Sequence, residues 1–308
     1  MKWNIYSKLW VIFFVLMGAA CTNQMEDAIP VSDQPIEFSV QSDWKEIPNT
    51  RSNPGKPQFD AKDTIQIFGF HRSSNGEKKF MYRVGDGNRG QKVIYDGTNW
   101  NYSPKRFWPK EGKLDFYAGY PQYSVLNDEA NHRMTYEQTV NPLQLDLLWG
   151  VSPDHDCAKD RKNNVSITMK HALARVNIIF DKSLGEIKQA KVSAYKAGYF
   201  EKTDTDGIPL WIVEDKSVKN ILEVPFPTPE NQSSIGEVNV FILPDKITEL
   251  ILTKLDGTVI DVSDKIQNIT FEAGKLYNLK ISKGEQKNTN TRSHSADEFI
   301  KISEISDA

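Results

Sequence analysis

Cys21 is the residue whose surroundings most clearly predict a chemical modification. It directly follows three small residues at positions 18–20, and an apolar run over residues 9–17 precedes them. A basic start, a short apolar stretch and a small-residue cleavage site are the layout of a secretory signal. A cysteine immediately after such a site is typical of lipoproteins, in which its thiol accepts a diacylglyceryl group before the signal is cut off.

The apolar run is too short to remain in the membrane as a helix. It covers about nine residues, roughly half of the ~20 that a spanning helix requires. We therefore predict that residues 1–20 are a signal peptide, removed in the mature protein. We also predict that Cys21 carries fatty acyl chains, palmitate among them, which hold the protein on the outer membrane with its body exposed at the cell surface. Two or more acyl chains anchor a protein stably, whereas one binds only marginally.

Other residues that could do chemistry do not form a recognisable site. No Gly-rich phosphate loop, Gly-x-Ser-x-Gly turn or His-Glu-x-x-His helix is present in the sequence. His155-Asp156-Cys157 falls short of a four-ligand zinc site and is expected to be a solvated loop. Residues 204–207 (Asp-Thr-Asp-Gly) lack the remaining ligands of a calcium loop and are expected to be a hairpin turn. The sequence thus predicts no enzyme, no metal and no cofactor.

Charge and cysteine content narrow the class of protein further. The formal net charge is −3, and loss of Lys2 and Lys8 with the signal peptide takes it from −3 to −5. A mildly acidic chain of this kind argues against a nucleic-acid partner. The chain has two cysteines, so an acylated Cys21 leaves Cys157 without an intrachain disulfide partner. Its stability must therefore come from packing.

The elements that would position these residues are short strands. Short apolar stretches separated by turn residues recur along the chain, and several of them, such as 36–40 and 190–195, alternate between apolar and polar residues. We expect strands at residues 36–40, 64–70, 92–95, 99–102, 114–120, 165–169, 175–180, 190–195, 238–243, 249–253 and 277–281. Asp96-Gly97 and Asp256-Gly257 supply the positive-φ residues of tight hairpin turns. No amphipathic helix of ten or more residues is apparent. The pattern predicts an all-β fold built from sandwiches.

The length of the chain predicts two such sandwiches. A single sandwich takes ~100 residues, and a polar break follows residue 180. We expect the following order: signal peptide 1–20, flexible tether 21–34, N-terminal β-sandwich domain 35–181, C-terminal β-sandwich domain 182–283 and polar tail 284–308.

Six segments, in order along the chain, resemble the motifs of one family: residues 36–38 with Thr50-Arg51, then 63–70, 102–121, 169–176, 241–244 and 273–279. The most recognisable is Phe107-Trp108-Pro109 followed by the strand that ends at Tyr120-Pro121. On these motifs the chain resembles the fimbrillin family, the type V pilins and related surface lipoproteins of Gram-negative anaerobes. The resemblance implies two tandem transthyretin-like sandwiches joined near Asp181, and a role as a fimbrial subunit or surface adhesin.

The resemblance also implies a route of assembly. In such pilins an arginine-specific protease removes the first strand, and a strand from a neighbouring subunit fills the exposed groove. The matching position here is Arg51, so that cleavage before Ser52 would release residues 36–40; an uncut chain that stays anchored is the alternative. A possible donor strand lies near the C-terminus, where Phe299, Ile300, Ile302 and Ile305 are apolar; a short surface helix or a frayed tail are the alternatives. The implied partners are other pilin subunits, joined by β-strand addition, the outer membrane, and host or bacterial surface ligands.

The aromatic residues distinguish this role from a rival one. Six of them are expected to fill a sandwich core: Trp100, Tyr102, Phe107, Trp108, Phe116 and Tyr117. If they were instead exposed on one face, the chain would fit a non-polymerising surface lipoprotein that binds carbohydrate or peptide for nutrient uptake. His171 lies in an apolar context and is expected to shape the junction between the two domains rather than to act as a base.

Overall fold

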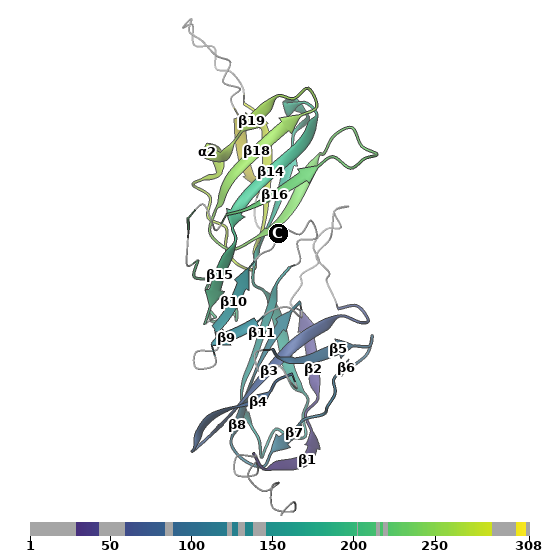
Figure 1. The fold of residues 1–308 in the computed structure, drawn as a ribbon, viewed down its shortest axis with the longest axis vertical. Coiled ribbons are helices and arrows are strands. Elements are labelled where there is room, and N and C mark those ends of the chain that lie inside the picture. Colours follow the sequence, from purple (N-terminus) through teal and green to yellow (C-terminus); the bar gives the residue numbers. More distant parts are fainter. Residues whose placement is uncertain are drawn as a thin grey trace, which may run out of the picture.

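The computed structural model describes residues 29–42, 59–83, 89–121, 125–128, 133–137, 146–201, 203–213, 216–217, 221–284 and 300–305. Within these ranges the chain is almost entirely β, which confirms the predicted fold class. The two helices described there are short: η1 spans Lys182–Leu184 and α2 spans Ser263–Ile266. The strands form two groups that follow one another along the long axis of the molecule (Figure 1).

The first group is dominated by an eight-stranded sheet. Its strands run in the order β2-β12-β11-β8-β3-β5-β6, with β4 paired to β3. Their bounds are β2 Phe38–Ser42, β3 Thr64–Ser73, β4 Gly76–Met81, β5 Gln91–Tyr95, β6 Trp100–Asn101, β8 Lys113–Tyr120, β11 Leu148–Asp156 and β12 Val165–His171. A short ribbon of β1 (Val31–Pro35) and β7 (Phe107–Pro109) lies at the end of the long axis (Figure 1).

The central strand β3 is buried on both of its faces. Ile65 and Ile67 belong to one hydrophobic cluster, whereas Phe68 and Phe70 belong to another. Since successive side chains of a strand point to opposite faces, the sheet is covered on both sides. A strand buried in this way reads as a continuous apolar run instead of an alternating one.

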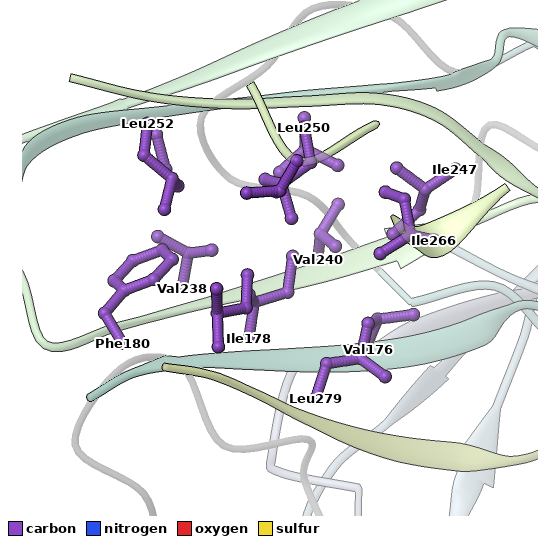
Figure 2. Close-up of a cluster of buried hydrophobic side chains, with 14 of the residues drawn as sticks. Val176, Ile178, Phe180, Val238, Val240, Ile247, Leu250, Leu252, Ile266 and Leu279 are labelled. Carbon is purple, nitrogen blue, oxygen red and sulfur yellow. The ribbon is translucent and has the colours of Figure 1, made fainter. Parts of the chain in front are cut away.

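The second group consists of two four-stranded sheets. One has the order β17-β13-β20-β21 and the other the order β16-β14-β18-β19. Their bounds are β13 Ala174–Phe180, β14 Ile187–Tyr195, β16 Ile221–Pro227, β17 Glu237–Ile242, β18 Ile247–Lys254, β19 Val259–Asp261, β20 Leu276–Lys283 and β21 Ile300–Ile305. Figure 2 shows apolar side chains of both sheets meeting between them, for example Leu250 and Leu252 above Val238 and Ile178.

A small three-stranded sheet links the two groups. It has the order β15-β10-β9, with β9 at Val125–Asp128, β10 at Arg133–Glu137 and β15 at Ala197–Phe200. β10 pairs with β15 over four residue positions, from Met134 with Phe200 to Glu137 with Ala197. Residues far apart in the chain therefore share this sheet, which lies between the two groups in Figure 1.

The predicted turns are present where the sequence placed them. Gly97 (φ +103°) lies in the turn between β5 and β6, and Gly257 (φ +87°) in the turn between β18 and β19. The Asp96 carboxylate accepts hydrogen bonds from the backbone N–H groups of Thr98 and Asn99, at 2.8 and 2.7 Å. These local contacts explain why Asp-Gly is a dependable hairpin signal.

The strand pairing differs from the expected division in three places. β13, expected in the N-terminal domain 35–181, pairs with β17 and β20 of the second group. β1 overlaps the expected tether 21–34 and pairs with β7. β21, within the expected tail 284–308, pairs with β20. Alternation predicts that a segment is a strand, but the sheet it joins depends on distant partners. The transthyretin-like topology implied by the family resemblance stays a prediction.

Candidate functional site: two edge strands

β2 lies at the edge of the eight-stranded sheet and makes an unusual pairing. It runs parallel to β12, with Phe38 opposite Val165 and Ser42 opposite Met169, whereas the neighbouring pairs of this sheet are antiparallel. The backbone N–H of Val165 donates to the carbonyl oxygen of Glu37 at 2.8 Å. The edge of β12 is thus covered by a strand that comes from the start of the chain.

Residues 36–42, which contain β2 and are called the β2 segment, contribute three side chains to the core of the first group. Ile36 is fully buried, and Phe38 and Val40 are 5% and 9% exposed. The ring of Phe38 packs edge-on against Phe116, with the ring centroids 5.4 Å apart. Fully burying an apolar side chain of this size stabilises the fold by about 1.5–3 kcal/mol. The segment therefore fills the core as well as covering an edge.

Two aromatic side chains also bind the backbone of this segment. Tyr102 donates its hydroxyl hydrogen to the carbonyl oxygen of Ile36 at 2.8 Å, and the indole Nε1 of Trp100 donates to that of Val40 at 3.1 Å. Burial raises the pKa of Tyr102 to about 12, so the hydroxyl stays protonated as a donor. Trp and Tyr combine a large apolar body with a polar tip, which suits a groove that holds a strand.

The second edge strand is β21. It pairs antiparallel with β20, with Ile300 opposite Lys283, Ile302 opposite Ile281 and Ile305 opposite Asn278. On its other side β20 runs parallel to β13. The C-terminal strand thus completes the sheet of its own chain, and its removal would leave the backbone groups of β20 unpaired along one edge.

A model of the fimbrillin-like family matches residues 50–296 of the chain. The chain belongs to the fimbrillin-like family. This finding confirms the resemblance read from the six sequence motifs. Membership supports a fimbrial-type subunit at the cell surface rather than an enzyme. No curated protein matches the chain.

Solved structures of two candidate cell-adhesion proteins share the fold of this fimbrillin-like chain at low sequence identity. A candidate cell-adhesion protein of Bacteroides uniformis is 17% identical, with a TM-score of 0.56 over 89% of this chain and 97% of that one. A second one, from Bacteroides ovatus, is 12% identical, with a TM-score of 0.54 over 90% and 97%. The fimbrial anchor protein Mfa2 of Porphyromonas gingivalis is 12% identical, with a TM-score of 0.41 over 87% and 95%.

Several predicted site residues lie outside the described residues. These are the lipidation residue Cys21, the processing pair Arg51 and Ser52, and Phe299 of the possible donor strand. Ile300, Ile302 and Ile305 lie in β21. Among the described residues, no helix has the length and hydropathy of a membrane span.

Four of the six aromatic residues that were predicted to fill the core of the fimbrillin-like chain are buried in it. Trp108 and Phe116 are fully buried, and Trp100 and Tyr102 are 5% and 7% exposed. Phe107 is an exception, because 38% of it is exposed at the start of β7. Tyr117 is half-buried and packs against the cluster that contains Phe68 and Phe70, on the opposite face of the sheet.

The weaker chemical candidates have structural roles. Residues 155–157 are not a solvated loop: His155 and Asp156 end β11, and Cys157 is fully buried in the core. Burial raises the pKa of the Cys157 thiol to about 12, which makes it unreactive. Residues 204–207 form the predicted turn, in which the Asp204 carboxylate accepts from the N–H groups of Asp206 and Ile208, both at 2.9 Å. The described ranges contain no group of three His, Cys, Asp or Glu side chains that could hold a metal.

His171 lies at the junction of the two strand groups, as the sequence predicts. It ends β12, and β13 begins three residues later. Its Nδ1 lies 2.5 Å from the Oδ2 atom of the buried Asp146, and this contact orients the imidazole ring. Nearby, burial lowers the pKa of Arg175, whose guanidinium carbon lies 5.9 Å from the ring centroid of Phe241.

Sequence reasoning missed the aromatic cluster that joins the groups. Trp149 of β11 lies 5.3 Å from Phe200 of β15, and Phe200 lies 4.9 Å from Trp211, measured between ring centroids. Leu243, which follows β17, is fully buried in the same cluster. The apolar run of residues 147–149 was an available signal, since a strand buried on both faces shows no alternation.

Proposed function

We propose that this fimbrillin-like chain is a fimbrial subunit that reaches the outer membrane through a lipid on Cys21 and joins other subunits by strand addition. One observation carries the proposal: the β2 segment is an edge strand whose three apolar side chains fill the core. A strand that serves as both an edge cover and a core filler can be exchanged for one of similar pattern from a neighbour.

Cleavage after Arg51 would detach both β1 and β2, because both precede it in the chain. Their loss would uncover the edge of β12 and remove the acceptor of the Trp100 hydrogen bond. It would also remove the nearer of the two backbone acceptors of the Tyr102 hydroxyl, the carbonyl oxygen of Ile36. A donor without its acceptor and an open sheet edge are both costly, so the groove would bind a replacement strand strongly.

The proposed replacement is the C-terminal strand of a neighbouring subunit. β21 carries three isoleucines at positions 300, 302 and 305, and it pairs with β20 of its own chain in the structure. Donation would therefore require β21 to exchange one partner strand for another.

A carbohydrate- or peptide-binding lipoprotein was the rival function. It would require a platform of exposed aromatic side chains on one face of a sandwich. The burial of Trp100, Tyr102, Trp108 and Phe116 in the core favours the fimbrial function instead.

The decisive experiment is intact-mass analysis of the protein recovered from the native cell surface. A processed pilin gives a mass that begins at Ser52 and carries no lipid, whereas a permanent anchor or accessory subunit gives a lipidated mass that begins at Cys21. For a processed pilin, we expect Arg51→Ala to retain the lipidated form and to abolish polymers. Arg161→Ala, an arginine in the turn after β11, is the matched control. Polymers built from uncut chains, or an unlipidated chain that begins at residue 21, would contradict the proposal.

A further inference from the structure

The groove that holds the β2 segment has three apolar positions. Ile36, Phe38 and Val40 occupy them, and all three side chains are buried. In the pairing with β12, Phe38 lies opposite Val165 and Val40 lies opposite Ile167, and these partners are buried in the same cluster. Successive side chains of a strand point to opposite faces. A strand that fills this groove therefore needs apolar residues at three alternate positions.

The central position suits an aromatic side chain. The ring centroid of Phe38 lies 5.8 Å from that of Tyr102 and 5.4 Å from that of Phe116. Tilted and edge-on pairs of this kind stabilise a core beyond the burial of apolar area alone. An aliphatic residue at this position would lose both ring contacts.

The position between the first two apolar residues faces a cation. Lys105 donates through Nζ to the two carboxylate oxygens of Glu37, at 2.9 and 2.8 Å. Loss of the β2 segment would remove this carboxylate from Lys105. An acidic residue at the same position of a replacement strand would restore the ion pair, whereas a lysine there would be repelled.

The C-terminal segment of the chain does not have this pattern. No three alternate residues within 284–308 are all apolar. One alignment sets Ile300 and Ile302 at the first two apolar positions, but it sets Glu304 at the third and Lys301 beside Lys105. The other sets the same isoleucines at the second and third positions, with a glutamate at the first. In both alignments a carboxylate would enter the apolar core, and its burial there is costly.

We propose that the groove selects a strand with the order apolar, acidic, aromatic, polar, apolar, and that this strand belongs to a subunit of different sequence and not to a second copy of this chain. The inference rests on the proposed strand addition. Backbone hydrogen bonds give affinity for any added strand, and the pockets for alternate side chains give specificity. A buried carboxylate and a lysine beside Lys105 both act against the chain's own C-terminal strand. Copies of this chain alone would therefore not form a polymer by this route.

The first test places the C-terminal sequence in the groove of the uncut chain. A variant with Glu37→Lys, Phe38→Ile, Val40→Glu and Gln41→Ile carries the sequence of residues 300–305 at positions 36–41. A partial variant with Phe38→Ile and Gln41→Ile keeps the acidic residue and the third apolar one. In thermal unfolding, the midpoint of the first variant should lie about 10 °C below that of the partial variant. Equal midpoints would overturn the proposal.

The matched control makes the same two charge changes in the second strand group. Glu230→Lys with Val259→Glu alters two exposed residues and should move the midpoint of the parent chain by no more than about 2 °C. A drop as large as that of the four-substitution variant would also overturn the proposal, because the change in charge and not its place in the groove would then explain the loss.

The second test measures selection of a free strand. In the mature chain with Cys21→Ser, a specific protease site replaces residues 50–55 and is cut after folding, so that the β2 segment stays in place until a peptide displaces it. Mass spectrometry of the bound peptide measures the displacement. A peptide of residues 298–306 should compete about 100-fold more weakly than a peptide of residues 34–42. Lys301→Glu with Glu304→Val in the weaker peptide should recover at least about tenfold.

The outcomes of the second test separate the two levels of the proposal. Equal competition by the 34–42 and 298–306 peptides would overturn the selectivity while leaving strand addition in place. Displacement by no peptide, with 34–42 included, would overturn the strand addition on which the selectivity rests.

Discussion

The core of the first strand group contains a larger share of aromatic side chains than the core of the second. The first contains Phe38, Trp100, Tyr102, Trp108 and Phe116. The second is mainly aliphatic, with valine, leucine and isoleucine supplied by both of its sheets (Figure 2).

This difference in composition matches a difference in what each core holds. In the first group, aromatic side chains bind the backbone of a strand from the start of the chain through their polar tips. Aliphatic side chains have no such donors, so the second core relies on close packing between two sheets. In the proposed assembly, the polar tips of these aromatic side chains are the groups that a replacement strand would contact.

The largest effect is expected from removing the β2 segment. A chain that begins at Ser52 loses the buried side chains of Ile36, Phe38 and Val40, which lowers the free energy of unfolding of the first group by about 5–9 kcal/mol, from about 1.5–3 kcal/mol for each. Urea unfolding followed by tryptophan fluorescence measures this loss against the chain that begins at residue 21.

Adding a peptide to the shortened chain tests whether a strand can return to the groove. A peptide of residues 34–42 should restore the lost stability, and a peptide of residues 297–308 should do so if the C-terminal strand is the donor. Equal stability of the two chains would show that β2 is not part of the core, and restoration by neither peptide would contradict strand exchange at this groove.

A substitution in the aliphatic core should have an intermediate effect. Leu250→Ala removes a fully buried side chain from the second group and should lower its free energy of unfolding by about 2–5 kcal/mol. Binding of the 34–42 peptide to the chain that begins at Ser52 should not change, since Leu250 lies in a different cluster from the groove. A parallel loss of peptide binding would show that the two cores are coupled, with the cluster around Trp149 and Phe200 as the route.

The smallest effect is expected from a single hydroxyl group. Tyr102→Phe removes the hydrogen bond to the carbonyl oxygen of Ile36 and should cost about 0.5–1.5 kcal/mol in the uncut chain. The same substitution should cost less in the chain that begins at Ser52, because the nearer acceptor is already gone and only the longer hydrogen bonds with the Arg106 backbone, at 3.3 and 3.4 Å, remain. A double-mutant cycle on urea unfolding measures the difference, and equal costs in the two chains would mean that the hydroxyl does not hold the strand.

The raised pKa of Tyr102 predicts that folding stability falls at alkaline pH. Folding raises the pKa of Tyr102 to about 12 from an ordinary value of about 10, so the protonated hydroxyl is favoured in the folded state. Its contribution is fully present below pH 10 and is lost as the pH rises toward about 12. The uncut chain should therefore lose stability over this range more steeply than its Tyr102→Phe variant, as thermal unfolding at several pH values would show.

Much of the fold could be predicted from local patterns. Alternation located β5, β14 and β20, and the Asp-Gly pairs located two hairpins. Burial of Trp108 and Phe116 was predictable because large aromatic residues on strands seldom stay exposed. The start of β11 was harder to predict, since Leu148 and Trp149 are buried on opposite faces and such a stretch has no alternation to detect.

The candidate site was predictable only in part. The motif match drew attention to residues 36–40 and to the apolar positions near the C-terminus. It did not predict that Trp100 and Tyr102 bind the backbone of Val40 and Ile36. These contacts join residues 60 and 66 positions apart in the chain, a separation at which sequence spacing carries little information about contact.

The sequence by itself determined the positions of most strands, their turns and the apolar positions that become the cores, because these depend on side-chain alternation and on backbone preferences within a few residues. Only the tertiary structure decided that β13 joins the second group, that β2 pairs parallel with β12, and that Phe107 is exposed while Trp108 is buried. The physical reason is that a strand accepts any partner of matching pattern, and the choice is made by how much apolar surface the whole chain buries.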